Sequence, residues 1–140
     1  MKKLNINKPS REQLTYWKNR DIELKLSYTI DEKYKISTNK IYSWCHRTFR
    51  KKISDYYHEL VYSDCLKLKQ FDFKVNIDFI FYFKKRALDS SNCSFIAKCI
   101  EDWFTKNWLI KDDNIDYIWK ISMESRKWEE NKIEIEFSKY

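Results

Sequence analysis

The stretch from residue 71 to residue 83 carries an apolar side chain at every second position without interruption. These positions are Phe71, Phe73, Val75, Ile77, Phe79, Phe81 and Phe83. Because side chains alternate between the two faces of a strand, this period predicts one long β-strand. Its other face turns apolar at Ile80 and Tyr82, so one end is expected to be covered on both sides. Such rings could stack nucleic-acid bases, but we favour a sheet face packed on helices.

Weaker patterns predict the remaining elements. Period-2 alternation predicts strands at 22–30, 117–123 and 133–137, with a turn at 125–131. Helical spacing predicts helices at 38–62 and 91–107, the second capped by Ser90 or Ser91. The order strand, helix, strand, helix, strand, strand predicts an α+β fold, with helices packed against a small mixed sheet.

Both helices are expected to present an apolar stripe. The first stripe comprises Ile41, Trp44, Phe49, Ile53, Tyr56, Tyr57, Leu60 and Val61. The second comprises Phe95, Ile96, Cys99, Ile100, Trp103 and Phe104. Stripes of this kind bury one side of a helix against a core.

Length and composition indicate one domain. Residues 21–140 are enough for a single core, preceded by a polar extension at 1–20 with a possible short helix at 10–18. The chain has no glycine, so its turns fall to Asn, Asp and Ser.

Net charge and cysteine spacing indicate which partners and which cellular compartment suit the chain. The net charge of +7 suits a nucleic-acid partner, although a Lys, Asn and Ile bias also fits an AT-rich coding sequence. No apolar run approaches a membrane span, which predicts a soluble, cytoplasmic protein. The cysteines form no CxxC pair, so reduced, buried thiols are expected rather than a zinc site with the two histidines. The residues concerned are Cys45, Cys65, Cys93, Cys99, His46 and His58.

Acidic residues gather in one segment of this basic chain. They are Asp89, Asp102, Asp112 and Asp113, interspersed with Asn92 and Lys98. Carboxylates hold hard cations and positive charge holds phosphate, so the segment suggests metal-assisted chemistry on a polyanion. A helix of about 17 residues spans about 25 Å, so its two ends share an ion only if residues 104–111 fold back. Taken singly, Lys98 and Asp102 are also an ordinary i,i+4 salt bridge.

The spacing of these residues resembles that of RusA-type Holliday junction resolvases. Asp89-x-x-Asn92, then Lys98, Asp102 and Asp112-Asp113, follow the family's motif. Upstream, the segment 36–42 and the basic residues that follow resemble the family's asparagine segment and basic helix. The resemblance covers about residues 22–137. It implies a small, RusA-like, dimeric, magnesium-dependent endonuclease of the kind encoded largely by phages and prophages.

The resemblance also implies roles for individual residues. The catalytic set would be Asp89, Lys98, Asp112 and Asp113. Asp89 and Asp113 would bind Mg²⁺, for which Mn²⁺ could substitute, with Asp102 and Asp112 as ligands or support. Asn92 would orient a ligand or water, and Lys98 would contact the scissile phosphate. The DNA contacts would be Asn39, Lys40, His46, Arg47, Arg50, Lys51, Lys52, Lys84, Lys85 and Arg86.

The chain departs from the family pattern at two points. Ser91 stands where the best-known members of the resembled family carry a second aspartate. A phage branch of that family shares the Leu-Asp-x-x-Asn form found here. Lys98 follows Asn92 by six residues rather than three, which is nearly one extra helical turn and keeps a similar direction.

Three alternatives remain open. A domain of the same fold could bind branched DNA without cutting it, or could serve protein interaction with a charge that is only compositional. His46 and His58 could act as a general base, although we expect His46 to contact phosphate and His58 to pack within its helix.

Overall fold

The structure is a computed structural model and describes residues 22–43 and 46–140. The expected extension at 1–20 with its helix at 10–18, and the stripe residue Trp44, lie outside the described residues.

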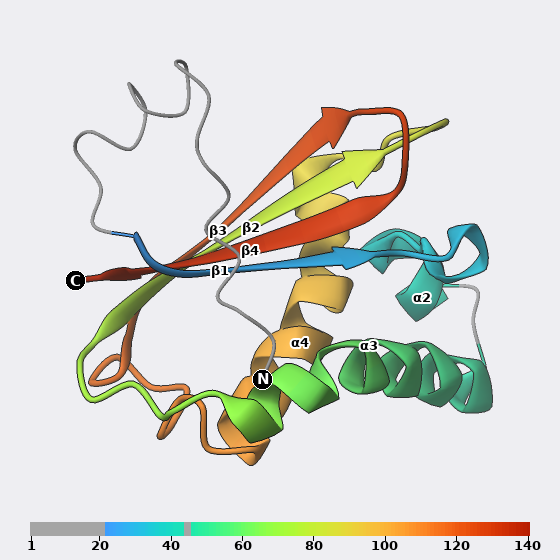
Figure 1. Cartoon of the computed structure of the whole chain (residues 1–140). Helices are drawn as coiled ribbons and strands as arrows, with labels where there is room; N and C mark the ends of the chain where they lie inside the picture. The colour runs from blue at the N-terminus through green and yellow to red at the C-terminus, as the bar shows by residue number, and fades with distance from the viewer. Residues whose placement is uncertain (1–21, 44–45) are drawn as a thin grey trace.

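Four strands form one mixed sheet in the order β1-β4-β2-β3. The strands are β1 (Ile22–Thr29), β2 (Val75–Phe83), β3 (Ile118–Lys127) and β4 (Lys132–Lys139). β2 and β3 are parallel, whereas β4 pairs antiparallel with both β1 and β2. Parallel neighbours need a crossover connection, and the chain between β2 and β3 supplies one through a helix (Figure 1). The predicted α+β fold with a small mixed sheet is confirmed.

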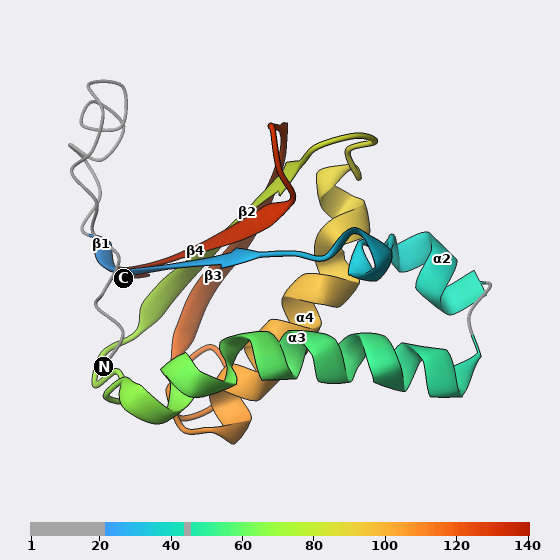
Figure 2. The same cartoon turned by 45° about the vertical axis from the view of Figure 1, so that its right-hand side comes forward.

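The three α-helices among the described residues lie on the same side of the sheet (Figures 1 and 2). They are α2 (Thr38–Ser43), α3 (Arg47–Lys67) and α4 (Ser94–Lys106), with short 3-10 helices η1 (Glu32–Tyr34) and η2 (Ser90–Cys93). α3 and α4 pack across each other, and none of the described helices has both the length and the apolar character needed to cross a membrane.

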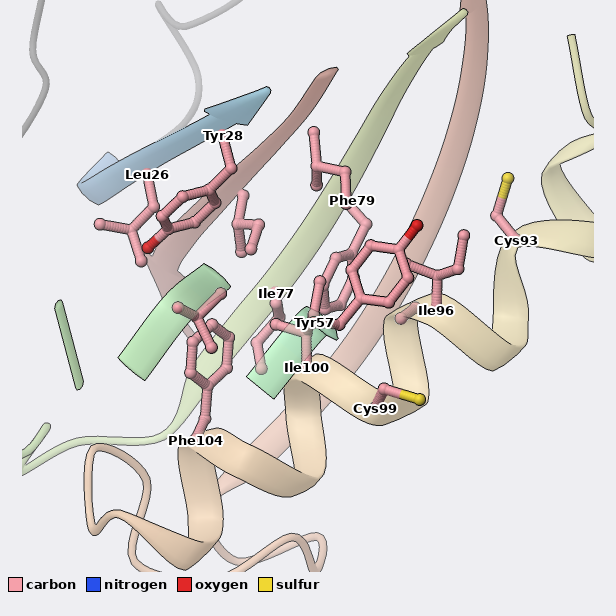
Figure 3. Close-up of a cluster of buried hydrophobic side chains, with 14 of the residues drawn as sticks. Leu26, Tyr28, Tyr57, Ile77, Phe79, Cys93, Ile96, Cys99, Ile100 and Phe104 are labelled. Atoms are coloured by element: carbon pink, nitrogen blue, oxygen red, sulfur yellow. The ribbon is translucent and has the colours of Figure 1, made fainter. Parts of the chain in front are cut away.

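The core fills the space between this sheet face and the two long helices (Figure 3). Ile77 and Phe79 of β2 meet Ile100 and Phe104 of α4, and all four side chains are fully buried. Tyr57 of α3 is also fully buried, and its hydroxyl donates a 2.6 Å hydrogen bond to the backbone oxygen of Tyr34. The aromatic alternation in β2 therefore serves packing rather than base stacking.

The single helix predicted at 38–62 is wrong, because the structure has two helices there. His46 has an extended backbone (φ −66°, ψ 151°), and its Nδ1 accepts a 3.1 Å hydrogen bond from the Thr48 N–H. That bond satisfies one of the orphan donors at a new helix start, so α3 begins afresh at Arg47. α3 then continues beyond the predicted end to Lys67.

The long strand also begins later than predicted. β2 starts at Val75, while Phe71 and Phe73 lie in the preceding loop and are partly buried against the core. The Phe71 N–H donates a 3.0 Å hydrogen bond to the Leu109 backbone oxygen, and its ring centroid lies 5.0 Å from that of Phe137. The apolar alternation extends to Phe71 and Phe73, outside the strand, because this loop closes one end of the core.

The turn predicted at 125–131 begins too early, because β3 pairs with β2 as far as Lys127. A register shift at Val75 also changes which β3 side chains face the core. The period predicts Trp119 on the same face as Ile121 and Met123, but Trp119 is 48% exposed and Ile118 is buried instead. Val75 pairs with Ile118 and Asn76 with Lys120, so Trp119 is the extra residue of a β-bulge, while Ile121 and Met123 pack against the core as predicted.

Candidate active site

A tight reversal after α4 returns the chain toward the middle of that helix. Trp108 adopts a left-handed backbone (φ 65°), and its N–H donates to the Thr105 oxygen at 3.1 Å. The Leu109 N–H donates to the Phe104 oxygen at 3.0 Å, so the two bonds together form a Schellman motif. Leu109 and Ile110 are then buried, which secures the return.

The return brings Asp113 to Lys98, the fold-back on which the predicted site depended. Lys98 Nζ lies 3.1 Å from Asp102 Oδ1 and 3.7 Å from Asp113 Oδ2. Its third neighbour is Glu101, whose Oε1 lies 3.7 Å away. The hydrogen bond to Asp102, followed by the nearby charges of Glu101 and Asp113, raises the pKa of Lys98 above its ordinary value.

Glu101 is a member of this group that the sequence analysis missed. The residue is 8% exposed, and burial raises its pKa above the ordinary value, against the opposing charge of Lys98. Its i,i+3 spacing from Lys98 was the available signal, because residues three apart share a helix face.

Asp112 and Asp89 lie differently from the predicted ligand set. Asp112 Oδ1 accepts a 2.8 Å hydrogen bond from the Asp113 N–H, and its Oδ2 accepts one of 3.2 Å from Asn114. The Asp112 carboxylate thus organises its own turn. Asp89 is the exposed N-cap residue of η2, before the first turn of α4, and no described ion pair joins it to Lys98.

Asn92 connects the acidic segment to the asparagine segment. Its Oδ1 accepts a 3.4 Å hydrogen bond from the Asn39 N–H of α2. Thr38 Oγ1 lies beside it and accepts a 3.0 Å hydrogen bond from the Phe95 N–H in the first turn of α4. The predicted cap at Ser90 or Ser91 is therefore wrong, because the N-cap of α4 is Cys93 and the capping oxygen comes from α2.

Two of the predicted carboxylate ligands lie close to each other's position, and the others do not. Among the described residues, no three His, Cys, Asp or Glu side chains are grouped as ligands for one metal. Asp102 and Asp113, however, converge on one ammonium group, and Mg²⁺ is commonly held by one or two carboxylates and several waters. Asp102 and Asp113 are thus the two carboxylates that could bind such an ion, at the position where the Lys98 ammonium lies, whereas Asp89 and Asp112 do not belong to the pair.

The predicted DNA-contact residues divide between separate places. Arg50 and Lys51 line a hollow of about 440 Å³ between α3 and α4, together with Lys98 and Asp102. The exposed residues Asn39 and Lys40 lie on α2, and Arg47 and Lys52 lie on the first two turns of α3. The basic residues 84–86 follow β2 in the loop before η2, which lies apart from α3 in both views (Figures 1 and 2).

Contacts within the 84–86 turn tie it to the sheet end. The Lys84 N–H donates a 2.9 Å hydrogen bond to Asn131 Oδ1, and the Arg86 backbone oxygen accepts one of 2.9 Å from Lys35 Nζ. Lys85 is exposed beside them. These contacts hold the turn at the end of β2, three residues before Asp89 in the sequence.

The histidines and described cysteines have structural environments. His46 caps α3, and His58 stacks on Trp103 with ring centroids 4.2 Å apart and an interplanar angle of 7°. Cys65, Cys93 and Cys99 are free and buried, as predicted, while Cys45 lies outside the described residues. Burial raises the pKa of Cys99 to about 11, so its thiol stays protonated at neutral pH.

Comparison with known proteins finds no matching family model and no matching curated protein.

Proposed function

We propose that this chain is a magnesium-dependent endonuclease that cuts four-way or otherwise branched DNA. The observation that carries the proposal is the convergence of Asp102 and Asp113 on Lys98 Nζ, at 3.1 and 3.7 Å. A lysine among paired carboxylates supplies both a contact for phosphate and ligands for a cation in one place. The resemblance to RusA-type resolvases supports the same reaction class.

In this proposal Asp102 and Asp113 hold the ion, and Lys98 contacts the scissile phosphate. Bound magnesium would neutralise phosphate charge and lower the pKa of an attacking water. Asp89, Asn92 and Asp112 remain proposed supporting residues.

The surrounding surface supports a polyanionic substrate. Arg50 and Lys51 flank the Lys98 group in the same hollow, and the whole chain carries a net charge of +7. Phosphate contacts would give an affinity that falls steeply with salt and would recognise the branch by its shape. A homodimer is proposed as well, because two symmetric nicks in a four-way junction require two equivalent sites.

A cleavage assay tests the proposal. A labelled four-way junction is incubated with and without Mg²⁺, using the native chain, Asp113→Asn and Lys98→Ala. Asp116→Asn is the matched control, because this exposed carboxylate lies in the same loop outside the Lys98 group. Paired nicks that need Mg²⁺ and disappear only in the first two variants are expected. Equal cleavage by Asp113→Asn would overturn the site assignment.

The same assay separates the second candidate function. A non-catalytic branched-DNA-binding protein, favoured by the position of Asp89 apart from the other carboxylates, would bind the junction at low salt and leave it uncut with Mg²⁺ or Mn²⁺.

A further inference from the structure

We propose that the hollow between α3 and α4 takes an unpaired nucleobase at the branch point, stacked against the His58–Trp103 pair. This inference rests on the proposed function and deepens it, because it names the feature of branched DNA that the site would recognise. His58 and Trp103 have no role in the proposed hydrolysis.

The shape of the surface is the first argument. A hollow of about 440 Å³ contains Lys98, a second hollow measures about 450 Å³, and His58 and Trp103 line both. Clefts of about 300–1,000 Å³ are typical for small-molecule groups, and a single base falls within that class. The aromatic pair is therefore part of the wall of both hollows.

The charge of the two hollows is the second argument. Four cationic side chains and one carboxylate line the first, and these are Arg50, Lys51, Lys98, Lys106 and Asp102. Two carboxylates and no Lys or Arg line the second, namely Asp55 and Glu59. Lys51 pairs with Asp55 at 2.8 Å and Lys98 pairs with Asp102 at 3.1 Å, so Arg50 and Lys106 are the cations that would attract a phosphate to the first hollow. A nucleotide would then place its base toward Trp103.

The aromatic pair itself is the third argument. Burial lowers the pKa of His58 below its ordinary value, so the ring is neutral at pH 7 and offers a π face. Trp103 is half-buried beside His58, so part of its side chain is accessible. Stacking on an aromatic ring is how proteins hold unpaired bases without reading their sequence.

A binding experiment without Mg²⁺ tests the inference. The probes are a branched duplex with one unpaired adenine at the branch point and the same duplex with an abasic site there. The native chain is expected to bind the adenine probe about fivefold or more tightly, the lower range for one stacked base. Trp103→Leu should abolish this preference, and Trp103→Phe should retain most of it. Equal affinity of the native chain for both probes would overturn the inference.

A second readout applies if Trp103→Leu fails to fold. The unpaired adenine is replaced by 2-aminopurine, whose fluorescence falls when it stacks, and the native chain is titrated into the probe. Quenching is expected, and unchanged fluorescence at saturation would overturn the inference. Cleavage tested separately with Mg²⁺ keeps the outcomes distinct. Base preference without cleavage removes only the nuclease proposal, whereas cleavage without base preference removes only the stacking site.

Discussion

Lys98 Nζ lies 3.7 Å from Asp113 Oδ2, although the two residues belong to α4 and to the loop that follows it. The contact depends on the reversal at Trp108, because a straight continuation of α4 would carry Asp113 away from Lys98. The candidate site is thus assembled by one turn, and its parts can be tested separately.

The Lys98–Asp113 pair should contribute little to stability. Both side chains are about half exposed, at 56% and 47%, and such ion pairs contribute about 0–1 kcal/mol. A double-mutant cycle of Lys98→Met and Asp113→Asn in urea unfolding should give a coupling energy below about 1 kcal/mol. A larger value would mean that activity losses in these variants reflect folding.

Replacing Glu101→Gln should increase the free energy of unfolding, relative to the native chain, more at pH 7 than at pH 4. Burial raises the folded-state pKa of Glu101, so the folded state binds more protons than the unfolded state between the two pKa values. Stability from this group is therefore complete below the unfolded pKa and is lost as the pH rises through the folded pKa. Urea unfolding at both pH values, with the exposed Glu59→Gln as control, measures the difference. A variant with the native pH dependence would contradict the assignment.

His58 should give the opposite pH dependence. Burial lowers its folded-state pKa, so the unfolded state binds the extra proton as the pH falls below about 6.5. Stability is therefore lost on acidification, and His58→Phe, which keeps a ring against Trp103, should reduce the fall in unfolding free energy below about pH 6.5. His46→Asn is the comparison, because it retains a capping side chain at the other described histidine. An unchanged slope in His58→Phe would be the negative result.

The stability of Trp108 variants should depend on how readily the new residue adopts the left-handed backbone conformation. The left-handed conformation costs a non-glycine residue roughly 1–2 kcal/mol, most severely for β-branched side chains. Trp108→Gly should be neutral or stabilising by up to about 1 kcal/mol, while Trp108→Val should destabilise by about 1 kcal/mol. Thermal unfolding measures both, and cleavage should fall further in the valine variant because Asp113 is displaced. Equal stability of the two variants would argue against the left-handed turn.

Thr38→Val should weaken the start of α4 by about 1 kcal/mol, the usual effect of losing a capping oxygen. The Thr38 hydroxyl accepts from the Phe95 N–H at 3.0 Å and lies 2.8 Å from Ser94 Oγ. Thr38→Ser keeps the oxygen and should retain most of the stability. Similar unfolding midpoints for the two variants would show that the cap has little effect.

Much of the architecture was predictable because periodicity is a local property. The alternation of Ile77, Phe79 and Phe81 indicated β2, and the spacing of Ile96 and Ile100 indicated the buried face of α4. Such patterns report which side of one element meets the core, whatever the partner is. They did not locate the helix break at His46, where a side-chain cap starts a new helix.

The candidate site divides in the same way. The shared helix face of Lys98 and Asp102 follows from their positions in the chain, because i,i+4 spacing has that result in any α-helix. The approach of Asp113 to this pair, and the separate position of Asp89, depend on how the chain folds. The tertiary structure also placed Arg50 of α3 in the hollow beside Lys98. These outcomes depend on a chain reversal stabilised by burial of Leu109 and Ile110, and on the packing of two helices distant in sequence, which local residue patterns do not encode.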